Sequence, residues 1–398
     1  MSAGTSVRAR MLGFAFLDEV GPLITLHTLW FADHGVTAGQ ISAVFVLWAF
    51  VGVVLEVPSG ALADRVDRRK LVAASLWLRA LGFVVWLQWP TVTGLAVGAV
   101  LWATHSAFAS GAWEALIFDQ LTALGEQEDY QRTHARIEQA STAGIFTGTV
   151  AAWGLLHLEV PLAWLGWATV VLHAPSWLAI RTLPAVPMAL DDDDDGALTF
   201  ASWWRTLKAG VAQVAARPHV SRLVAVAAAL GGLLLLDEYV PLLGRARDAD
   251  DDQVALLVLA VWFGGLAGTE AAARFPSTAR TVALVLGIST AAAIAALVVG
   301  PWWLLPLLAV GYGAQFFAWI HADARLQERL DAPSRATATS VRELLSNGVS
   351  MGILAVVGVL AVGEDPTPGV LGMLAAILVV AVMVARWVPD AAQRTSRS

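Results

Sequence analysis

The sequence has no cysteine, and this absence removes several kinds of protein at once. Without thiols there is no disulfide framework, no iron–sulfur ligation, no thiolate zinc site and no cysteine nucleophile. Charge is also scarce, since Asp, Glu, Lys and Arg make up 14% of the 398 residues, against about 25% in ordinary soluble domains. So few charged side chains do not cover a water-soluble fold of this length, and the sequence predicts a protein whose main solvent is lipid.

Long apolar runs make up most of the chain, in which 57% of the residues are hydrophobic. A helix needs about 20 mostly apolar residues to cross a bilayer, and twelve such segments follow one another. We therefore expect an all-α integral membrane protein whose twelve transmembrane helices form two six-helix pseudo-repeats. The expected spans are residues 10–32, 39–62, 71–89, 94–118, 138–157, 161–183, 220–243, 253–273, 280–300, 302–324, 336–362 and 367–388.

The positive charges predict how these spans are oriented, because cytoplasmic loops retain Lys and Arg while translocated loops avoid them. All but four of the 25 basic residues fall on the side of the N-terminus. Arg245 and Arg247 fall on the opposite side, and Arg79 and Arg342 lie within spans. We expect a multi-pass protein of the cell membrane with both termini cytoplasmic.

A short internal repeat indicates two similar halves. Residues 17–23 read LDEVGPL, and residues 236–242, which lie 219 positions later, read LDEYVPL. We expect an N-terminal half at 1–183, a cytoplasmic linker with an amphipathic helix at 184–219 and a C-terminal half at 220–398. Paired halves of this kind place a substrate site near the bilayer midplane. One chain with both halves can form a whole pathway, so a monomer is expected.

The end of the second span carries a recognisable motif. Residues 60–70, GALADRVDRRK, resemble the G-x-L-A-D-R-x-G-R-R/K signature that the major facilitator superfamily carries between helices 2 and 3. The resemblance implies twelve helices, transport, and a gate at the cytoplasmic ends. Asp64 would cap a helix terminus, and Arg65 and Arg68 would tie the two halves together in the outward-open state. The implied gating residues are Gly60, Asp64, Arg65, Arg68, Arg69 and Asp119, the last being the acidic partner of the loop's arginine.

The sequence differs from the superfamily's patterns at two places. Asp67 stands where the signature has glycine, and the fifth span has Gly144-x-x-x-Gly148 rather than the Gly-Pro pair of drug/proton antiporters. Residues 110–119, SGAWEALIFD, resemble the S-G-x-x-E-A-L-x-x-D pattern of a bacterial branch related to drug and metabolite exporters.

Acidic side chains inside the predicted spans are candidates for proton or substrate binding, since a charge there costs about 2.5 to 3.5 kcal/mol on insertion scales. Asp18 and Glu19 are neighbours about 100° apart on a helix, so their side chains point in different directions. Either one binds a proton or a cationic substrate, or the pair is structural, with Arg79 as its partner. The same alternatives apply to Asp237 and Glu238, which lie nearer the outer surface.

Polar stripes and aromatic side chains complete the candidate site. The fourth span places Ser106, Ser110 and Glu114 four residues apart, close to His105, and the eleventh does the same around Glu343 and Asn347. Such stripes line a translocation path or form hydrogen bonds between helices. The candidate stacking residues, which otherwise pack as ordinary core, are Trp113, Tyr239, Tyr312 and Trp319.

Together these features predict a secondary active transporter that exports a small amphipathic organic compound by proton-coupled alternating access. Proton-coupled import of a small metabolite and a non-transporting sensor or scaffold are the alternatives. The sequence has no ATP-binding motif, no cluster with metal-ligand spacing and no basic face. We therefore expect no enzymatic activity, no cofactor, no metal and no nucleic acid; the expected partners are a small molecule, protons and the bilayer.

Overall fold

The computed structural model describes residues 3–63, 65–186, 205, 208, 210–212, 214–330 and 332–388. Within these residues the chain is helical apart from turns and one isolated bridge between Val362 and Asp365. It splits into two compact units, residues 1–200 with 251–256 and residues 201–250 with 257–398. Most of the predicted linker, including its amphipathic stretch, lies outside the described residues. The predicted all-α fold is confirmed.

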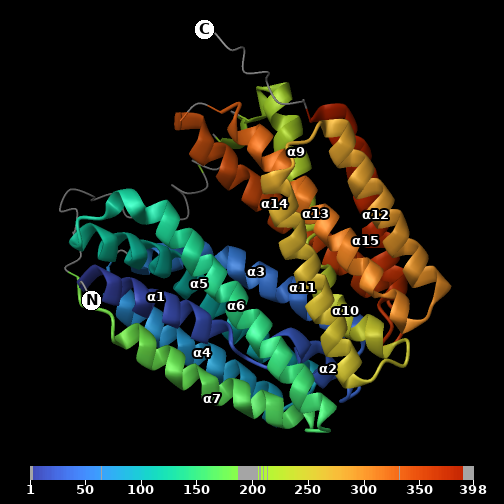
Figure 1. Cartoon of the computed structure of the whole chain (residues 1–398), viewed down its shortest axis with the longest axis horizontal. Coiled ribbons are helices and arrows are strands. Elements are labelled where there is room, and N and C mark those ends of the chain that lie inside the picture. Colours follow the sequence, from blue (N-terminus) through green and yellow to red (C-terminus); the bar gives the residue numbers. More distant parts are fainter. Residues whose placement is uncertain are drawn as a thin grey trace. The chain divides into compact units, whose positions relative to one another are not determined.

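The first unit holds the helices drawn from blue to green in Figure 1. Short 3-10 turns at Ile24–Leu26 and Gln127–Asp129 connect some of them. The helices are α1 (Ala3–Glu19), α2 (His27–Ala32), α3 (Ala38–Ala63), α4 (Arg68–Gln88), α5 (Val92–Ala123), α6 (Tyr130–His157) and α7 (Leu162–Arg181).

The second unit holds the helices drawn from yellow-green to red in Figure 1. A 3-10 turn at Trp302–Leu304 precedes one of them. The helices are α9 (Pro218–Gly232), α10 (Leu236–Arg245), α11 (Asp251–Arg274, except residues 251–256, which belong to the first unit), α12 (Ala279–Val299), α13 (Pro306–Gln327), α14 (Ala332–Leu360) and α15 (Thr367–Trp387).

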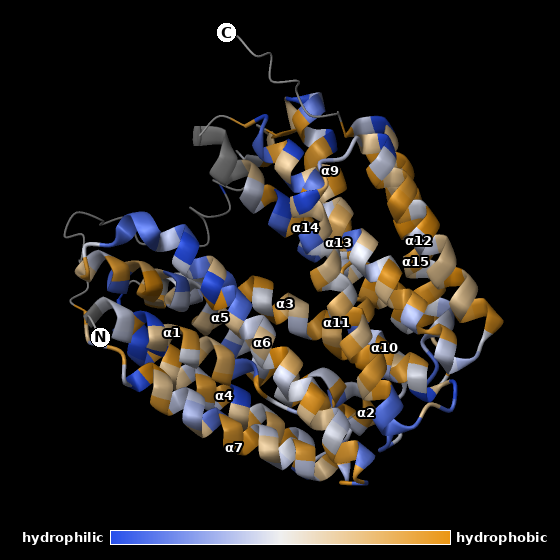
Figure 2. Cartoon of the chain, viewed as in Figure 1, coloured by the Kyte–Doolittle hydropathy of each residue, from blue (hydrophilic) through white to orange (hydrophobic). Residues whose placement is uncertain are grey.

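Apolar residues dominate these helices, and polar ones gather near helix ends and loops (Figure 2). Within the described residues, ten helices are long and apolar enough to cross a membrane, with α9 and α10 counted as one. The other two predicted spans correspond to α1 with α2, which is interrupted, and to α6, whose apolar part is diluted by glycine and threonine. Helices thus lie at the positions of all twelve predicted segments, and ten of these positions have the length and hydropathy of a membrane span among the described residues.

The first span is broken rather than continuous. α1 ends at Glu19 and helical structure resumes only at Ile24, because Pro22 has no N–H and its ring excludes a regular helix. A backbone N–H released by the break, that of Leu23, donates to the hydroxyl of Thr169 in α7 at 3.0 Å. Backbone groups freed within a membrane need such partners, because no water is there to replace them.

The seventh span is also broken, at a different place in the repeated motif. α9 ends at Gly232 and α10 begins at Leu236, so residues 233–235 leave carbonyls of α9 without helical donors. Side chains of α13 and α14 supply the donors. Gln315 donates to the carbonyl of Leu230 at 3.2 Å and Ser350 to that of Gly232 at 3.0 Å, while Ser346 adds a further bond to the carbonyl of Ala228 at 3.1 Å.

Candidate functional site

A buried ion cluster joins α1 to α4 in the first unit. Arg79 is 3% exposed, and its Nη1 lies 3.4 Å from Oδ2 of Asp18 while its Nη2 lies 3.2 Å from Oε2 of Glu19. Nη1 also donates to the backbone carbonyl of Asp18 at 3.1 Å. The structure thus contains the arginine pairing that the sequence offered as one of two alternatives.

Two features of α1 explain why an arginine is needed here. Pro22 stands four residues after Asp18 and has no N–H, so the Asp18 carbonyl lacks its helical donor and Arg79 takes that role. Asp18 and Glu19 also lie in the last turn of α1, at the negative end of the helix dipole, where anions are unfavourable. The guanidinium offsets both the dipole and the two carboxylates.

Aromatic rings surround the cluster. The guanidinium carbon of Arg79 lies 5.1 Å from the ring centre of Trp102 in α5, within the range of a cation–π interaction. Trp102 in turn lies 5.5 Å from Trp86 and 5.7 Å from His27. Sequence reasoning missed Trp102, because only the fold brings its helix beside Arg79.

One carboxylate oxygen in this cluster has no partner. Oδ1 of Asp18 is buried, and no hydrogen-bond partner for it exists among the described residues. Leaving such an acceptor unsatisfied is costly in a low-dielectric environment. It is therefore a position where a proton or a donor from a ligand would be favourable.

His105 lies near this cluster, but its Nδ1 already has a hydrogen-bond partner. It is 4% exposed, and its Nδ1 lies 3.2 Å from the hydroxyl of Ser75 in α4. This contact joins α5 to α4, as expected for a histidine that links helices.

The acidic pair of the second unit has a different environment. Asp237 and Glu238 lie in the first turn of α10, and the hydroxyl of Tyr312 in α13 donates a hydrogen bond to the Asp237 carboxylate. No cation lies beside either carboxylate within the part of the chain that the structure describes. The positive end of α10 stabilises anions at this position.

The repeated motif thus occupies opposite helix ends in the two units. In the first unit the acids end α1, at its negative pole, and require Arg79. In the second unit they begin α10, at its positive pole, and have a tyrosine donor instead. The same short sequence therefore gives two acidic sites of different electrostatics.

A second arginine cluster lies on α13 and α14. Arg342 pairs with Asp323 at 2.8 Å and with Glu343 at 3.1 Å, and its guanidinium lies 5.8 Å from the ring centre of Trp319. Asp323 was missed by sequence reasoning, although its spacing of four residues from Trp319 places both on one face of a helix. The cluster leaves the predicted stripe residues Glu343 and Asn347 exposed on α14.

The other predicted stacking and stripe residues divide between core and surface. Trp113 packs edge-on against Phe14 at 4.7 Å, and Tyr239 is fully buried. Glu114 is exposed on α5. Near it, burial and then the charge of Glu114 raise the pKa of the Tyr130 phenol at the start of α6, so that tyrosine stays neutral.

The gate residues implied by the loop between α3 and α4 are partly brought together. Arg68 pairs with Asp119 at the end of α5, with Nη1 2.6 Å from Oδ2. Arg65 is exposed in the turn after α3, and a Cβ on Gly60 would meet nothing within 4 Å. Asp64 lies outside the described residues.

Asp67, which replaces the glycine of the signature, has a clear role. Its φ is −54°, so no positive φ is required at this position, and its side chain accepts from the backbone N–H of Lys70 at 3.3 Å. It is the N-cap of α4, a position at which aspartate is favoured.

A sequence profile of the major facilitator superfamily matches residues 11–355. The chain belongs to the major facilitator superfamily. The resemblance that residues 60–70 indicated is thereby confirmed, and the protein is a multi-pass membrane transporter. A comparison with curated protein sequences finds no match.

Solved structures of superfamily transporters share this fold at low identity. The nucleoside transporter NupG has a TM-score of 0.75 and 15% identity, covering 96% of this chain and 98% of that one. A bacterial homologue of the iron transporter ferroportin has a TM-score of 0.70 and 14% identity, covering 97% and 99%. A D-xylose-proton symporter has a TM-score of 0.65 and 13% identity, covering 97% of each chain. At such identities the likeness establishes the fold and not the substrate.

Three side chains form hydrogen bonds with the backbone just after α7, and the superfamily motif does not predict these bonds. They come from α1, α4 and α5, and all donate to backbone carbonyls that follow the helix. Arg10 donates to Thr182 at 2.6 Å, Arg69 to Leu183 at 2.8 Å and Gln120 to Pro184 at 2.8 Å. The predicted gate residue Arg69 is thus engaged within its own unit.

Proposed function

We propose that the protein couples proton movement to the export of a small amphipathic organic compound by alternating access. The observation that carries this proposal is the buried cluster in which Arg79 is shared by Asp18 and Glu19 at the break of the first span. Intramembrane charges of this kind mark proton and substrate pathways.

In this proposal, a proton and a substrate cation exchange at the carboxylates of the cluster. A proton on either carboxylate removes one of the two charges that hold Arg79. Oδ1 of Asp18 is a favourable acceptor for that proton, since it is buried without a partner in the described part of the chain. The cationic group of a substrate competes for the same carboxylates, so proton binding releases substrate and substrate binding releases the proton.

The second unit contributes a weaker site of the same type. Asp237 and Glu238 are stabilised by the start of α10 and by Tyr312 rather than by an arginine. In this proposal they bind substrate or proton nearer the outer surface. The Arg68 pair with Asp119 acts as part of the gate between α3 and α4.

The surroundings favour an amphipathic cation as substrate. Trp102 lies against Arg79, and Trp86 and His27, which are buried, pack behind it. Carboxylates recognise a positive group, whereas aromatic rings recognise both a cation and an apolar body.

The test is accumulation of a panel of fluorescent lipophilic cations in energised cells that express the protein, with and without a protonophore. We expect lower accumulation than in control cells, and we expect the protonophore to abolish the difference. Asp18→Asn should remove most of the export while the protein is still made and inserted. Export that survives both treatments would contradict proton coupling through this cluster.

The matched control is Glu328→Gln, which neutralises an exposed acid that pairs with Arg325 on α13. It should export as the unchanged protein does. Unaltered accumulation across the whole panel, together with ligand-induced thermal stabilisation of the purified protein, would favour the sensor or scaffold instead.

Proton-coupled import is the second candidate, and α6 supplies the reason. This helix has Gly144 and Gly148 where drug/proton antiporters carry a Gly-Pro pair. In the structure both glycines pack against the break of the first span. Inside-out vesicles separate the two directions, because an exporter accumulates substrate in them when the interior is acidified and a symporter does not.

A further inference from the structure

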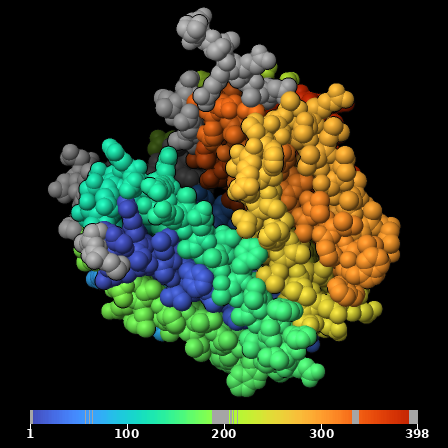
Figure 3. Space-filling model, viewed as in Figure 1, coloured from blue at the N-terminus to red at the C-terminus, as the bar shows by residue number. Residues whose placement is uncertain are grey.

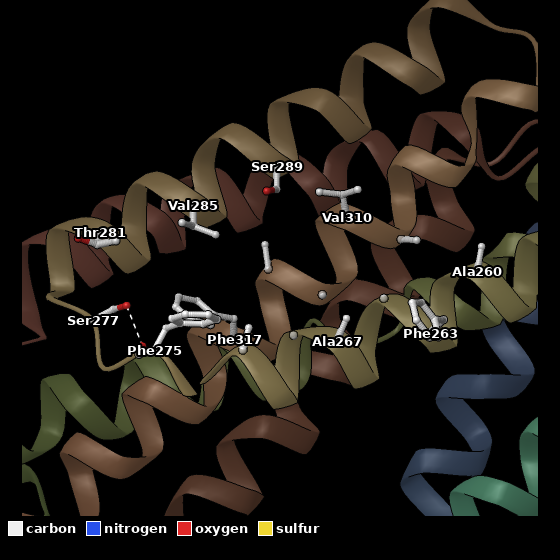
Figure 4. Close-up of a pocket in the computed structure, with 16 residues that line it drawn as sticks. Ala260, Phe263, Ala267, Phe275, Ser277, Thr281, Val285, Ser289, Val310 and Phe317 are labelled. Carbon is white, nitrogen blue, oxygen red and sulfur yellow. Dashed lines mark hydrogen bonds between the residues drawn. The ribbon is translucent and has the colours of Figure 1, made fainter. Parts of the chain in front are cut away.

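An apolar groove runs along the second unit between α11, α12 and α13 (Figure 4). Its volume is about 700 Å³, and none of its lining residues is charged. Phe263 and Phe275, both on the α11 side, are more than 60% exposed. On the viewed face of the molecule the yellow side chains of α11 lie beside the orange ones of α12 (Figure 3).

The groove exists because its floor is made of small residues. A Cβ on Gly268 of α11 would collide with the backbone carbonyl of Gly313 in α13, so these two helices touch through their backbones. Ala267 of α11 and Val285 and Ser289 of α12 then face one space in Figure 4.

The length of the groove matches one leaflet of a bilayer. Its α11 wall extends from Ala260 to Ala271, which is about 16 Å at a rise of 1.5 Å per residue. The hydrocarbon core of a bilayer is about 30 Å thick, so the groove covers roughly half of it. Apolar walls over that depth fit a hydrocarbon chain rather than water.

Two arginines flank the loop where the groove reaches the end of the helices. The loop between α11 and α12 contributes Phe275 and Ser277 to the lining, and it is flanked by Arg274 and Arg280. Arg274 is paired with Glu270 at 2.5 Å, whereas Arg280 is exposed in the first turn of α12. The start of a helix adds further positive potential for an anion.

We propose that this groove binds one acyl chain of an anionic phospholipid, with the lipid phosphate held at Arg280 and the start of α12. The apolar walls recognise the chain, and the arginine and helix end recognise the phosphate. The site lies wholly within the second unit and is independent of the acidic clusters.

The test uses the purified full chain in detergent, with phosphatidylglycerol and phosphatidylcholine of identical chains as probes. Native mass spectrometry and thermal unfolding report binding. We expect phosphatidylglycerol to be retained and to raise the melting temperature more than phosphatidylcholine. Ala267→Trp fills the groove at an exposed position and should abolish the difference. Val379→Trp places the same side chain on the exposed face of α15 and should leave the difference intact.

A second variant tests the headgroup. Arg280→Gln should weaken phosphatidylglycerol binding about fivefold, which is the loss of roughly 1 kcal/mol per cation near a membrane surface. Binding that persists unchanged in Ala267→Trp, equal binding of both lipids, or equal stabilisation by inorganic phosphate alone would overturn the proposal.

Discussion

The Arg79 side chain interacts with four different partners. It meets two carboxylates, the carbonyl that Pro22 leaves without a donor, and the face of Trp102. Three of these partners follow from the broken first span, because the break places the two carboxylates and a free carbonyl at the same helix end. The arginine is therefore a structural requirement of α1 as well as a candidate participant in transport.

This leads to a prediction for Arg79→Gln. Removing the cation leaves two carboxylates at the negative end of α1, and breaking a buried ion pair from one side typically costs about 3 kcal/mol or more. We expect the free energy of unfolding to fall by about 3 kcal/mol, measured by denaturant titration of the purified protein.

The control is Arg79→Gln combined with Asp18→Asn and Glu19→Gln. Neutralising the carboxylates removes the unpaired charge, so the triple variant should be more stable than the single one. A triple variant no more stable than Arg79→Gln would show that packing around the guanidinium, and not charge balance, fixes this site.

At the scale of elements, two glycines of α6 let that helix pack closely against the broken part of the first span. A Cβ on Gly144 would collide with the carbonyl of Phe16, and one on Gly148 would come within 2.9 Å of the backbone nitrogen of Gly21. The Gly144-x-x-x-Gly148 pattern is therefore a contact surface for α1, and this contact sets where Asp18 and Glu19 lie.

The corresponding prediction is that Gly144→Ala destabilises the protein by about 1 to 3 kcal/mol, the usual cost of forcing an extra carbon into a packed contact. Gly154→Ala is a matched control in the same helix, since a Cβ there meets nothing within 4 Å. It should be neutral or slightly stabilising, because alanine is the better helix former. Thermal unfolding of both variants measures this, and equal melting temperatures would contradict the contact.

The two helix breaks show what the sequence reveals and what it conceals. Gly21 and Pro22 are visible breakers in the first span, yet residues 233–235 of the seventh are three leucines within an apolar run. The carbonyls freed by that second break take donors from other helices, Gln315 and Ser350. Hydropathy and loop charge predicted the twelve spans, but partners contributed from distant helices have no signal in local sequence.

The same holds for the candidate site. Asp18, Glu19 and Arg79 were recognisable because a charge inside a span requires an explanation. Trp102 and Asp323 were not, because one is an ordinary tryptophan and the other lies near a helix end. Asp67 was read as a departure from the superfamily signature, and only its backbone geometry identifies it as a helix cap.

For the whole molecule, the absence of cysteine makes the predicted topology directly testable. Glu128 lies in the turn between α5 and α6, and Glu364 lies between α14 and α15; both are exposed. We expect a cysteine at Glu128 to react with a membrane-impermeant thiol reagent only in inside-out vesicles, and one at Glu364 only in intact spheroplasts.

The unsubstituted chain is its own control in this experiment, because it has no thiol to react. The predicted spans place seven helices, an odd number, between residues 128 and 364, so labelling of both positions from the same side would contradict the predicted topology. It would also remove the assignment of the basic loops to the cytoplasm.

The ion cluster at the end of α1 also bears on membrane voltage. An ionised Asp18 and Glu19 with Arg79 carry one net negative charge, so a proton and a monovalent organic cation neutralise the cluster equally. Exchanging one for the other moves no net charge through this site, and voltage acts only on moving charge, by about 2.3 kcal/mol per elementary charge per 100 mV. In the proposed exchange, the arginine would therefore make the first unit responsive to a difference in pH and indifferent to a difference in electrical potential.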